Sequence, residues 1–336
     1  MMTYMIMLFI VGFLCLLLAA GVKLMDSCNH FFDKTNTNAL RGFWCLIVVL
    51  VHIPAAYQNK IQDMIGSFAY IGVTFFFMTS SYGLSLSVAN NPATLKDFWI
   101  KRLPKLLIPC LIINCVTAFF NYIKGNEISI WSFIWINDWV QWLLICYLIF
   151  WATHKYSGKY QNAAICIFVI LFSLIVYVCK HWIERTTWCT EVFGFVWGVM
   201  LFKFKDSFVR WMQSKWFAKC LILCMIAGLL GISYLKLKPV VFYGDYLLKI
   251  LLGISITVFM LAVNTHLSIG NRVSNFLGSI SYEVYMLHGT VFGLVNFIMP
   301  SIESGLFILF SIIITVALSK LIQIFSKRLL NLMGIT

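Results

Sequence analysis

Apolar residues dominate the chain in long runs that polar residues interrupt only briefly. A helix that crosses a bilayer needs about 20 mostly apolar residues. On that criterion we expect eleven spans, at residues 3–20, 39–57, 66–88, 103–122, 136–153, 161–179, 188–202, 218–235, 246–264, 276–299 and 305–325. Barrel strands would instead alternate in polarity at every second residue. The pattern therefore predicts an all-α, polytopic transmembrane helical bundle with about 10–11 spans.

We expect residues 1–336 to form a single transmembrane domain. Residues 1–22 form an additional N-terminal span without the basic start and small-residue cleavage site of a signal peptide, so we expect this span to be retained. The main part of the bundle covers residues 36–328. No internal repeat is visible, and no hydrophilic stretch is long enough for an appended soluble domain.

Composition supports the membrane assignment and excludes two other classes of protein. Hydrophobic residues make up 61% of the 336 residues and charged residues only 11%, whereas soluble domains carry about 25% charged residues. A disordered chain would show the opposite balance. The net charge of +13 first suggests nucleic acid, but the basic residues form short clusters between apolar runs. That distribution indicates membrane topology and argues against a nucleic-acid partner.

The basic residues also predict an orientation in the membrane. Of the 25 Lys and Arg residues, 16 belong to alternate loops and the C-terminal tail, 6 belong to the opposite loops, and 3 lie within spans. The positive-inside rule places the side with 16 in the cytoplasm. We therefore expect a multi-pass protein of the bacterial plasma membrane, with its N-terminus outside and its C-terminus cytoplasmic.

Ionisable residues inside a bilayer are costly, so each is a functional candidate. The first pair is Arg41 and His52. Eleven helical residues turn the chain by about 1,100°, so both side chains should face one groove, about 16.5 Å apart along the axis. A neutral histidine near mid-membrane suits a general base, and an arginine suits a phosphate or carboxylate. A snorkelling arginine and a structural histidine are the alternative.

A basic cluster begins the fourth predicted span. Lys101, Arg102 and Lys105 lie close together there, and Lys101 and Lys105 share one helix face. The cluster could bind the phosphates of coenzyme A through charge-assisted hydrogen bonds. The alternative is simple anchoring at a membrane surface that carries anionic lipid.

Polar groups of two other spans are expected at a similar depth. Tyr282, Tyr285 and His288 recur at every third residue of the tenth span, which would place His288 about 18 Å from the cytoplasmic end. Ser80 and Ser81 of the third span would lie about 11–12 Å from its inner end. These groups should meet near His52, although a tyrosine stripe also serves ordinary helix packing.

Three further features have open interpretations. Glu283 is the only acid well inside a strong span, and it would orient a histidine or pair with a buried cation. Tryptophans around Asp138 form either an interfacial aromatic belt or a platform for a sugar. Cys179 and Cys189 flank one loop and could form a disulfide if that loop is extracytoplasmic. No metal-binding spacing occurs, so we expect no metal site.

Four short segments, in order along the chain, follow a known set of motifs. Arg41 and His52 match an Arg, ten residues and a His. IGVTFFFMTSS (71–81) matches Gly-Val-x-x-Phe-Phe-x-x-Ser-Gly except for Ser81 in place of the final Gly. DFWIKRLPKLLIP (97–109) is similar to a basic Phe-Tyr-x-x-Arg-x-x-Arg-x-x-Pro stretch, and LGSISYEVYMLH (277–288) contains Ser-Tyr-x-x-Tyr-x-x-His. From residue 36 onward the chain therefore resembles the acyltransferase-3 family of membrane acyltransferases.

This resemblance implies a membrane O-acyltransferase that takes an acyl group, acetyl as the first choice, from cytoplasmic acyl-CoA. The implied acceptor is a hydroxyl of a cell-surface glycan or lipid-linked sugar. On this hypothesis His52 is the general base, and the expected catalytic set is His52, Arg41, Tyr282, Ser81, Glu283 and His288. The expected cofactor-binding set is Arg102, Lys101, Lys105, Arg41 and Tyr285.

Two other functions fit parts of the same pattern. A transporter or flippase of glycan precursors would share the bundle and the intramembrane charges. That function gives no reason for a basic cluster beside an Arg–His groove. The inverted repeats typical of transporters are also not visible in the sequence. A sensor or partner-binding bundle derived from the enzyme would not need an intact Arg41 and His52.

Overall fold

Long helices make up almost the entire protein. The computed structural model describes residues 2–25, 27–180 and 188–335. Within these ranges there are eleven long helices: α1 (Met2–Ala19), α2 (Lys34–Val51), α4 (Ala69–Asn90), α5 (Phe98–Ile123), α7 (Asp138–Tyr156), α8 (Gln161–Cys179), α9 (Phe193–Gln213), α10 (Trp216–Leu237), α11 (Lys249–Asn264), α13 (Ser281–Ile298) and α14 (Ser304–Leu332). Each overlaps one predicted span, and the predicted all-α bundle is confirmed.

Shorter elements join these helices. They are the helices α3 (Lys60–Gly66), α6 (Trp131–Ile134) and α12 (Arg272–Ser279), the 3₁₀ turns Cys28–His30, Ala55–Tyr57, Pro92–Leu95 and Gly158–Tyr160, and a π-helical turn at Tyr243–Leu248. Strands β1 (Lys23–Leu24) and β2 (Leu267–Ser268) pair antiparallel, with Lys23 opposite Ser268. This small ladder joins the segment after α1 to the segment after α11.

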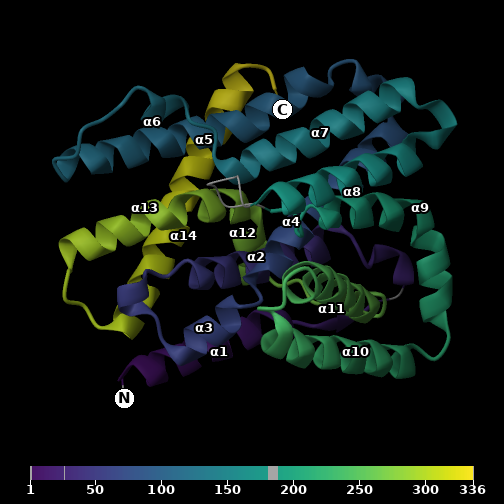
Figure 1. Ribbon diagram of the computed structural model, residues 1–336, viewed down its shortest axis with the longest axis horizontal. Helices are drawn as coiled ribbons and strands as arrows, with labels where there is room; N and C mark the ends of the chain where they lie inside the picture. Colours follow the sequence, from purple (N-terminus) through teal and green to yellow (C-terminus); the bar gives the residue numbers. More distant parts are fainter. Residues whose placement is uncertain (1, 26, 181–187, 336) are drawn as a thin grey trace.

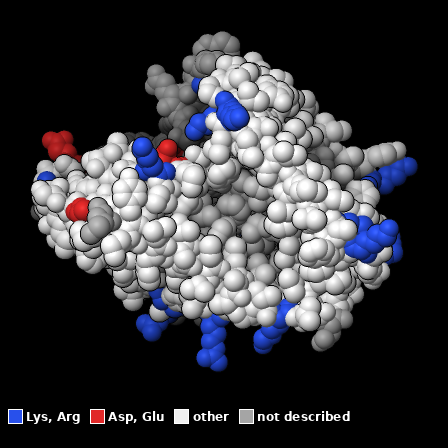
Figure 2. Space-filling view, turned by 90° about the horizontal axis from the view of Figure 1, so that it is seen from below, with Lys and Arg blue, Asp and Glu red and all other residues white. Residues whose placement is uncertain are grey.

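Seven of the described helical segments are long and apolar enough to cross a membrane by themselves: α1, α3 with α4, α5, α8, α10, α11 with its π-helical turn, and α14. The protein is therefore a multi-pass membrane protein. The more polar α2, α7, α9 and α13 complete the bundle. Figure 2 shows one face on which a wide area carries no charge, with Lys and Arg side chains mainly near its edges.

The centre of the bundle is formed by α2 and α4 (Figure 1). All seven residues from Trp44 to Leu50 of α2 are buried, as are the residues of α4 from Ala69 to Met78. A helix that is buried on every side must be surrounded by other helices. These two helices therefore carry residues that can line internal cavities.

Two predicted spans differ from the observed helices in ways that affect the site. The second span was expected to reach residue 57, but α2 ends at Val51, and His52 is its C-terminal cap. Pro54 explains this end, because the residue before a proline avoids the helical conformation. The tenth span is broken at Ile280, which separates α12 from α13. His288 therefore lies only about 10.5 Å along α13 from its start, not 18 Å into one continuous helix.

The N-terminal helix is attached to the bundle through its C-terminal end. The side-chain amide of Asn271 donates hydrogen bonds to the carbonyl oxygens of Leu17 and Ala20, at 2.9 and 3.0 Å. Carbonyl groups in the last turn of a helix have no partner within the helix, so this side chain satisfies two of them. The same Asn271 also caps the N-terminus of α12.

Candidate active site

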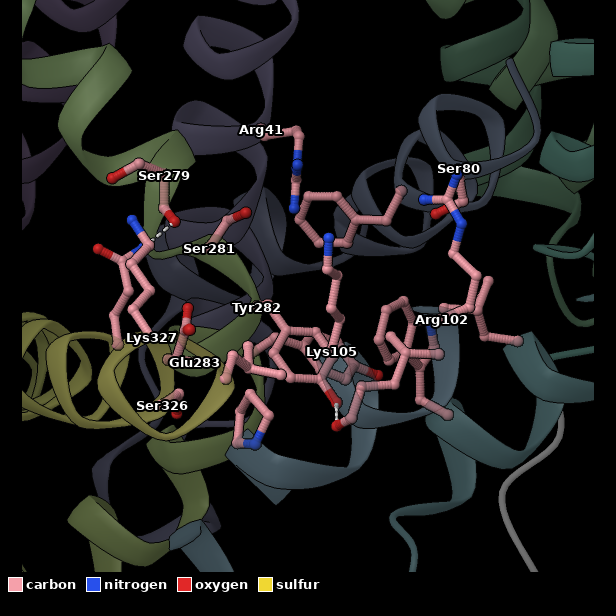
Figure 3. Close-up of a pocket in the computed structure, with 18 of the residues that line it drawn as sticks. Arg41, Ser80, Arg102, Lys105, Ser279, Ser281, Tyr282, Glu283, Ser326 and Lys327 are labelled. Carbon is pink, nitrogen blue, oxygen red and sulfur yellow. Dashed lines mark hydrogen bonds between the residues drawn. The ribbon is translucent and has the colours of Figure 1, made fainter. Parts of the chain in front are cut away.

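A cavity of about 860 Å³ lies between α2, α4, α5, α7, α12, α13 and α14. Its described lining holds five cationic side chains and one acid: Lys34, Arg41, Arg102, Lys105 and Lys327, with Glu283 (Figure 3). We call this space the basic cavity. Hydroxyl groups from Ser80, Ser279, Ser281 and Ser326 add hydrogen-bonding capacity to its wall. Such a lining favours a ligand that carries several negative charges.

Arg41 reaches the basic cavity from the third turn of α2. Its guanidinium lies 5.8 Å from the centre of the Phe76 ring, and its Nε–H is buried without a hydrogen-bond partner among the described residues. Buried polar groups in folded proteins nearly always have a partner. The Nε–H of Arg41 is therefore available to an acceptor on a ligand in the cavity.

The basic cluster of α5 divides between two environments. Arg102 and Lys105 line the basic cavity. Lys101 instead forms an ion pair with Asp97 at 3.1 Å, in which both side chains are more than half exposed. It lines a smaller neighbouring cavity of about 120 Å³ that it shares with Arg102 and Lys105. The structure thus separates Lys101 from the large cavity that holds Arg41.

The serine pair of α4 is also divided. Ser80 lines the basic cavity, whereas Ser81 is fully buried and donates a hydrogen bond to the carbonyl of Met78 at 3.1 Å. Ser81 packs against α9, where a Cβ added to Gly198 would lie 1.9 Å from the Ser81 hydroxyl. The expectation that Ser81 faces the reacting groups therefore needs correction, and Ser80 is the hydroxyl at the cavity.

α13 supplies one wall of the basic cavity through Tyr282, Glu283 and Tyr285. The Tyr282 hydroxyl donates a hydrogen bond of 2.7 Å to the carbonyl of Leu106, which joins α13 to α5 (Figure 3). In this arrangement the hydroxyl is already used for a structural contact rather than directed at an oxyanion. Glu283 is buried in the wall and is the one acid among the described lining residues.

His52 lies in a different cavity, so the prediction of one groove shared with Arg41 is wrong. This second space, which we call the histidine cavity, has a volume of about 300 Å³. It is lined by Val48, Val51, His52, Gly66, Ser67, Ala69, Tyr70, Val73, Trp188, Glu191, Tyr234, Lys249 and Tyr285. His52 is exposed at the end of α2 rather than enclosed within a helix groove.

The two histidines lie side by side, with ring centres 4.8 Å apart. Nδ1 of His52 is 2.8 Å from the carbonyl oxygen of Val48, and Nδ1 of His288 is 3.2 Å from that of Val284. A carbonyl oxygen only accepts, so each Nδ1 carries the hydrogen. In the neutral rings Nε2 is then left with its lone pair and can accept a proton.

Tyr285 lines both cavities. Along α2, Lys34 and Arg41 belong to the basic cavity and His52 to the histidine cavity, so the two spaces follow one another along the bundle. The Tyr285 ring lies 5.0 Å from Trp139 and 6.0 Å from His288. A thin aromatic layer thus stands between a cationic space and a histidine-containing one.

The sequence pointed to only part of this site. Glu191 and Lys249 form an ion pair of 2.7 Å in the histidine cavity, and neither residue was among the predicted site residues. Their separation of 58 residues hides the pairing. A search for opposite charges among intramembrane residues would have identified Glu191 and Lys249. Lys34, Trp139 and Lys327, which line the basic cavity, were also not among the predicted catalytic or cofactor-binding residues.

The structure also bears on the cysteine pair that could form a disulfide and on possible metal ligands. Cys179 and Cys189 are both described, and no disulfide joins them in the structure. No group of three or more metal-ligating side chains occurs in the part of the chain that the structure describes.

The fold and these cavities define a class of protein: a multi-pass membrane protein with a cationic cavity next to a pair of histidines. The family model described as an acyltransferase domain matches residues 34–323, which is most of the chain. The protein therefore belongs to the acyltransferase-3 family and is an acyltransferase. Comparisons with curated proteins and with solved structures gave no match.

Proposed function

We propose that this acyltransferase moves an acyl group, acetyl as the first choice, from cytoplasmic acyl-CoA to a hydroxyl of a cell-surface glycan or lipid-linked sugar. The observation that carries the proposal is the arrangement of two cavities around Tyr285, one cationic and one containing His52. A transfer reaction needs one place for the donor and another for the acceptor, with the reacting atoms between them.

The basic cavity suits coenzyme A. Its volume of about 860 Å³ lies within the usual range for cofactor sites, and its charges complement the phosphates of the donor. Arg41, Arg102 and Lys105 would hold those phosphates, and the pantetheine arm would extend along α13 toward Tyr285. Lys101 is left out of this set because it is paired with Asp97 at the surface.

The chemical step uses His52 as the general base. Its Nε2 removes the proton of an acceptor hydroxyl in the histidine cavity while the oxygen attacks the thioester carbonyl. The tetrahedral intermediate then collapses, the carbon–sulfur bond breaks, and the coenzyme A thiolate takes up the proton held by His52. The products are an ester and free coenzyme A. His288, adjacent to His52, helps to fix the orientation of the His52 ring.

A transporter or flippase of glycan precursors without acyl transfer is the alternative function. Membership of an acyltransferase family supports the transfer reaction instead. The two functions also differ in a measurable way, because only acyl transfer releases a free thiol from acyl-CoA.

The test is thiol release from acetyl-CoA by protein in lipid nanodiscs, supplied with a panel of sugar acceptors. We expect His52→Ala to lower turnover by about 10²–10⁴-fold, the usual contribution of a general base. His154→Ala is the matched control. Nδ1 of His154 contacts the carbonyl oxygen of Phe150, four residues earlier, just as Nδ1 of His52 contacts that of Val48, but His154 is not a lining residue of either cavity. Full turnover in His52→Ala would overturn the assignment of the base.

A further inference from the structure

The histidine cavity contains a buried hydroxyl that has no partner. Tyr70 is 9% exposed and lines the cavity, and its hydroxyl forms no hydrogen bond within the described residues. A buried polar group left unpaired costs free energy, so native proteins rarely keep one. At the wall of a cavity beside a candidate catalytic base, such a hydroxyl indicates a polar ligand that completes the bond.

An ion pair lies beside the ring of Tyr70. Nζ of Lys249 is 2.7 Å from Oε1 of Glu191 and 4.8 Å from the centre of the Tyr70 ring. The Thr190 hydroxyl donates to the other carboxylate oxygen of Glu191 at 2.8 Å. An ammonium group has three N–H donors, so Lys249 retains two for a ligand. The N–H donors of Lys249 and the acceptor oxygens of Glu191 therefore lie next to each other in the wall of the histidine cavity.

The charge of the histidine cavity differs from that of the basic cavity. Glu191 and Lys249 compensate each other, and no other Asp, Glu, Lys or Arg belongs to the described lining. The remaining wall includes the aromatic rings of Trp188, Tyr234 and Tyr285. Hydroxyl-rich rings fit such a wall, because each hydroxyl both donates and accepts and the carbon faces pack on aromatic rings.

From these features we infer that the histidine cavity is the acceptor site and binds an uncharged sugar unit through Tyr70, Lys249 and Glu191. This inference rests on the proposed function and adds the class of acceptor and the residues that recognise it. A carboxylated sugar is disfavoured, since its charge would compete with Glu191 for Lys249.

Tyr70→Phe is the sharpest variant, because it removes only the unpartnered hydroxyl. We expect the KM for the acceptor to rise about three- to tenfold, the value of one neutral hydrogen bond. The KM for acetyl-CoA should stay unchanged, and thermal stability should stay equal or rise. Tyr57→Phe is the control: its buried hydroxyl already donates to Asn296 at 2.6 Å, so that variant should lose stability and keep the acceptor KM.

The acceptors are the methyl glycosides of glucose, galactose, N-acetylglucosamine and glucuronic acid, offered with radiolabelled acetyl-CoA to protein in nanodiscs. We expect label in at least one neutral glycoside, and little in the glucuronide. Lys249→Met should strengthen the preference for the neutral sugars, because the carboxylate of Glu191 without its partner repels the carboxylate of the glucuronide. A preference for the glucuronide, an unchanged acceptor KM in Tyr70→Phe, or hydrolysis of acetyl-CoA without label in any sugar would each overturn the inference.

Binding of the same glycosides without donor separates this inference from the proposed function. If neutral glycosides bind and Tyr70→Phe weakens their binding, yet acetyl-CoA is never cleaved, the site assignment stands and the transfer reaction is wrong. If acetyl-CoA is cleaved but Tyr70→Phe binds every glycoside as the wild type does, the transfer reaction stands and the site assignment is wrong.

Discussion

At the scale of single residues, the direction in which a side chain leaves its helix decides which of the two cavities it lines. Arg41 and His52 were selected for their charge and spacing, but the helix between them ends at Val51, so the two side chains line different cavities. Ser80 and Ser81 show the same limit. Adjacent helical residues differ by 100° in direction, and only packing decides which of them meets a cavity.

A first prediction at this scale concerns Arg102. Replacing Arg102 with Gln should raise the KM for acetyl-CoA about 10- to 100-fold, the range for a charged hydrogen bond, while kcat changes little. Steady-state kinetics of thiol release measure both constants.

Lys101→Gln is the matched control for Arg102→Gln. Lys101 is the preceding residue of α5 and carries the same charge, but it is paired with Asp97 at the surface. We expect its KM for acetyl-CoA to stay within about twofold of the wild type, because an exposed ion pair contributes little. Equal effects of the two substitutions would show that the cluster acts only through its total charge.

At the scale of elements, hydrophobic runs were sufficient to place the long helices, but not their breaks or close contacts. The break at Ile280 has no proline to mark it, and only Gly278 and the serines on either side of Ile280 weaken the helix there. The contact between α4 and α9 depends on Gly194 and Gly198, one turn apart, where a Cβ would meet backbone oxygens of α4 at 2.0 and 2.3 Å. Small residues at this spacing allow membrane helices to approach closely.

This contact gives a prediction about stability. Gly198→Ala should force α9 away from Ser81 and lower the free energy of unfolding by about 1–3 kcal/mol, the usual cost of overpacking. Thermal unfolding in detergent, followed by size-exclusion chromatography, measures the effect.

Gly228→Ala is the control for this substitution. It also lies within a long helix, α10, but a Cβ there would meet nothing within 4 Å. Alanine is favoured over glycine in a helix by about 0.5–1 kcal/mol, so the control should be neutral or slightly stabilising. If both variants lost stability equally, close packing at Gly198 would not be the cause.

At the scale of the whole molecule, the sequence predicted the bundle but not its interior. The basic cavity is assembled from seven helices and from residues as distant as Lys34 and Lys327. No local pattern brings these two together, because their meeting depends on how every intervening helix packs. The opposite charges of Glu191 and Lys249 are the exception, since buried ions in a membrane protein usually pair.

The proposed orientation leads to a prediction about sidedness. Acetyl-CoA carries several negative charges and does not cross a sealed bilayer, so thiol release should occur only when it is added on the side of the C-terminus. Inside-out and right-side-out vesicles, with protease access to a C-terminal tag as the marker, measure this. Thiol release in sealed right-side-out vesicles would contradict the predicted topology.

The aromatic layer at Tyr285 has an electrical consequence. A voltage across a uniform bilayer falls over about 30 Å of hydrocarbon. On the proposed topology the basic cavity opens to the cytoplasm and the histidine cavity lies toward the outer face, so most of that voltage would fall across the thin layer of protein between them, beside His52 and His288. A proton that moves between an acceptor and a histidine at this point crosses part of the field. The rate of the reaction should then respond to whether the cell membrane is energised.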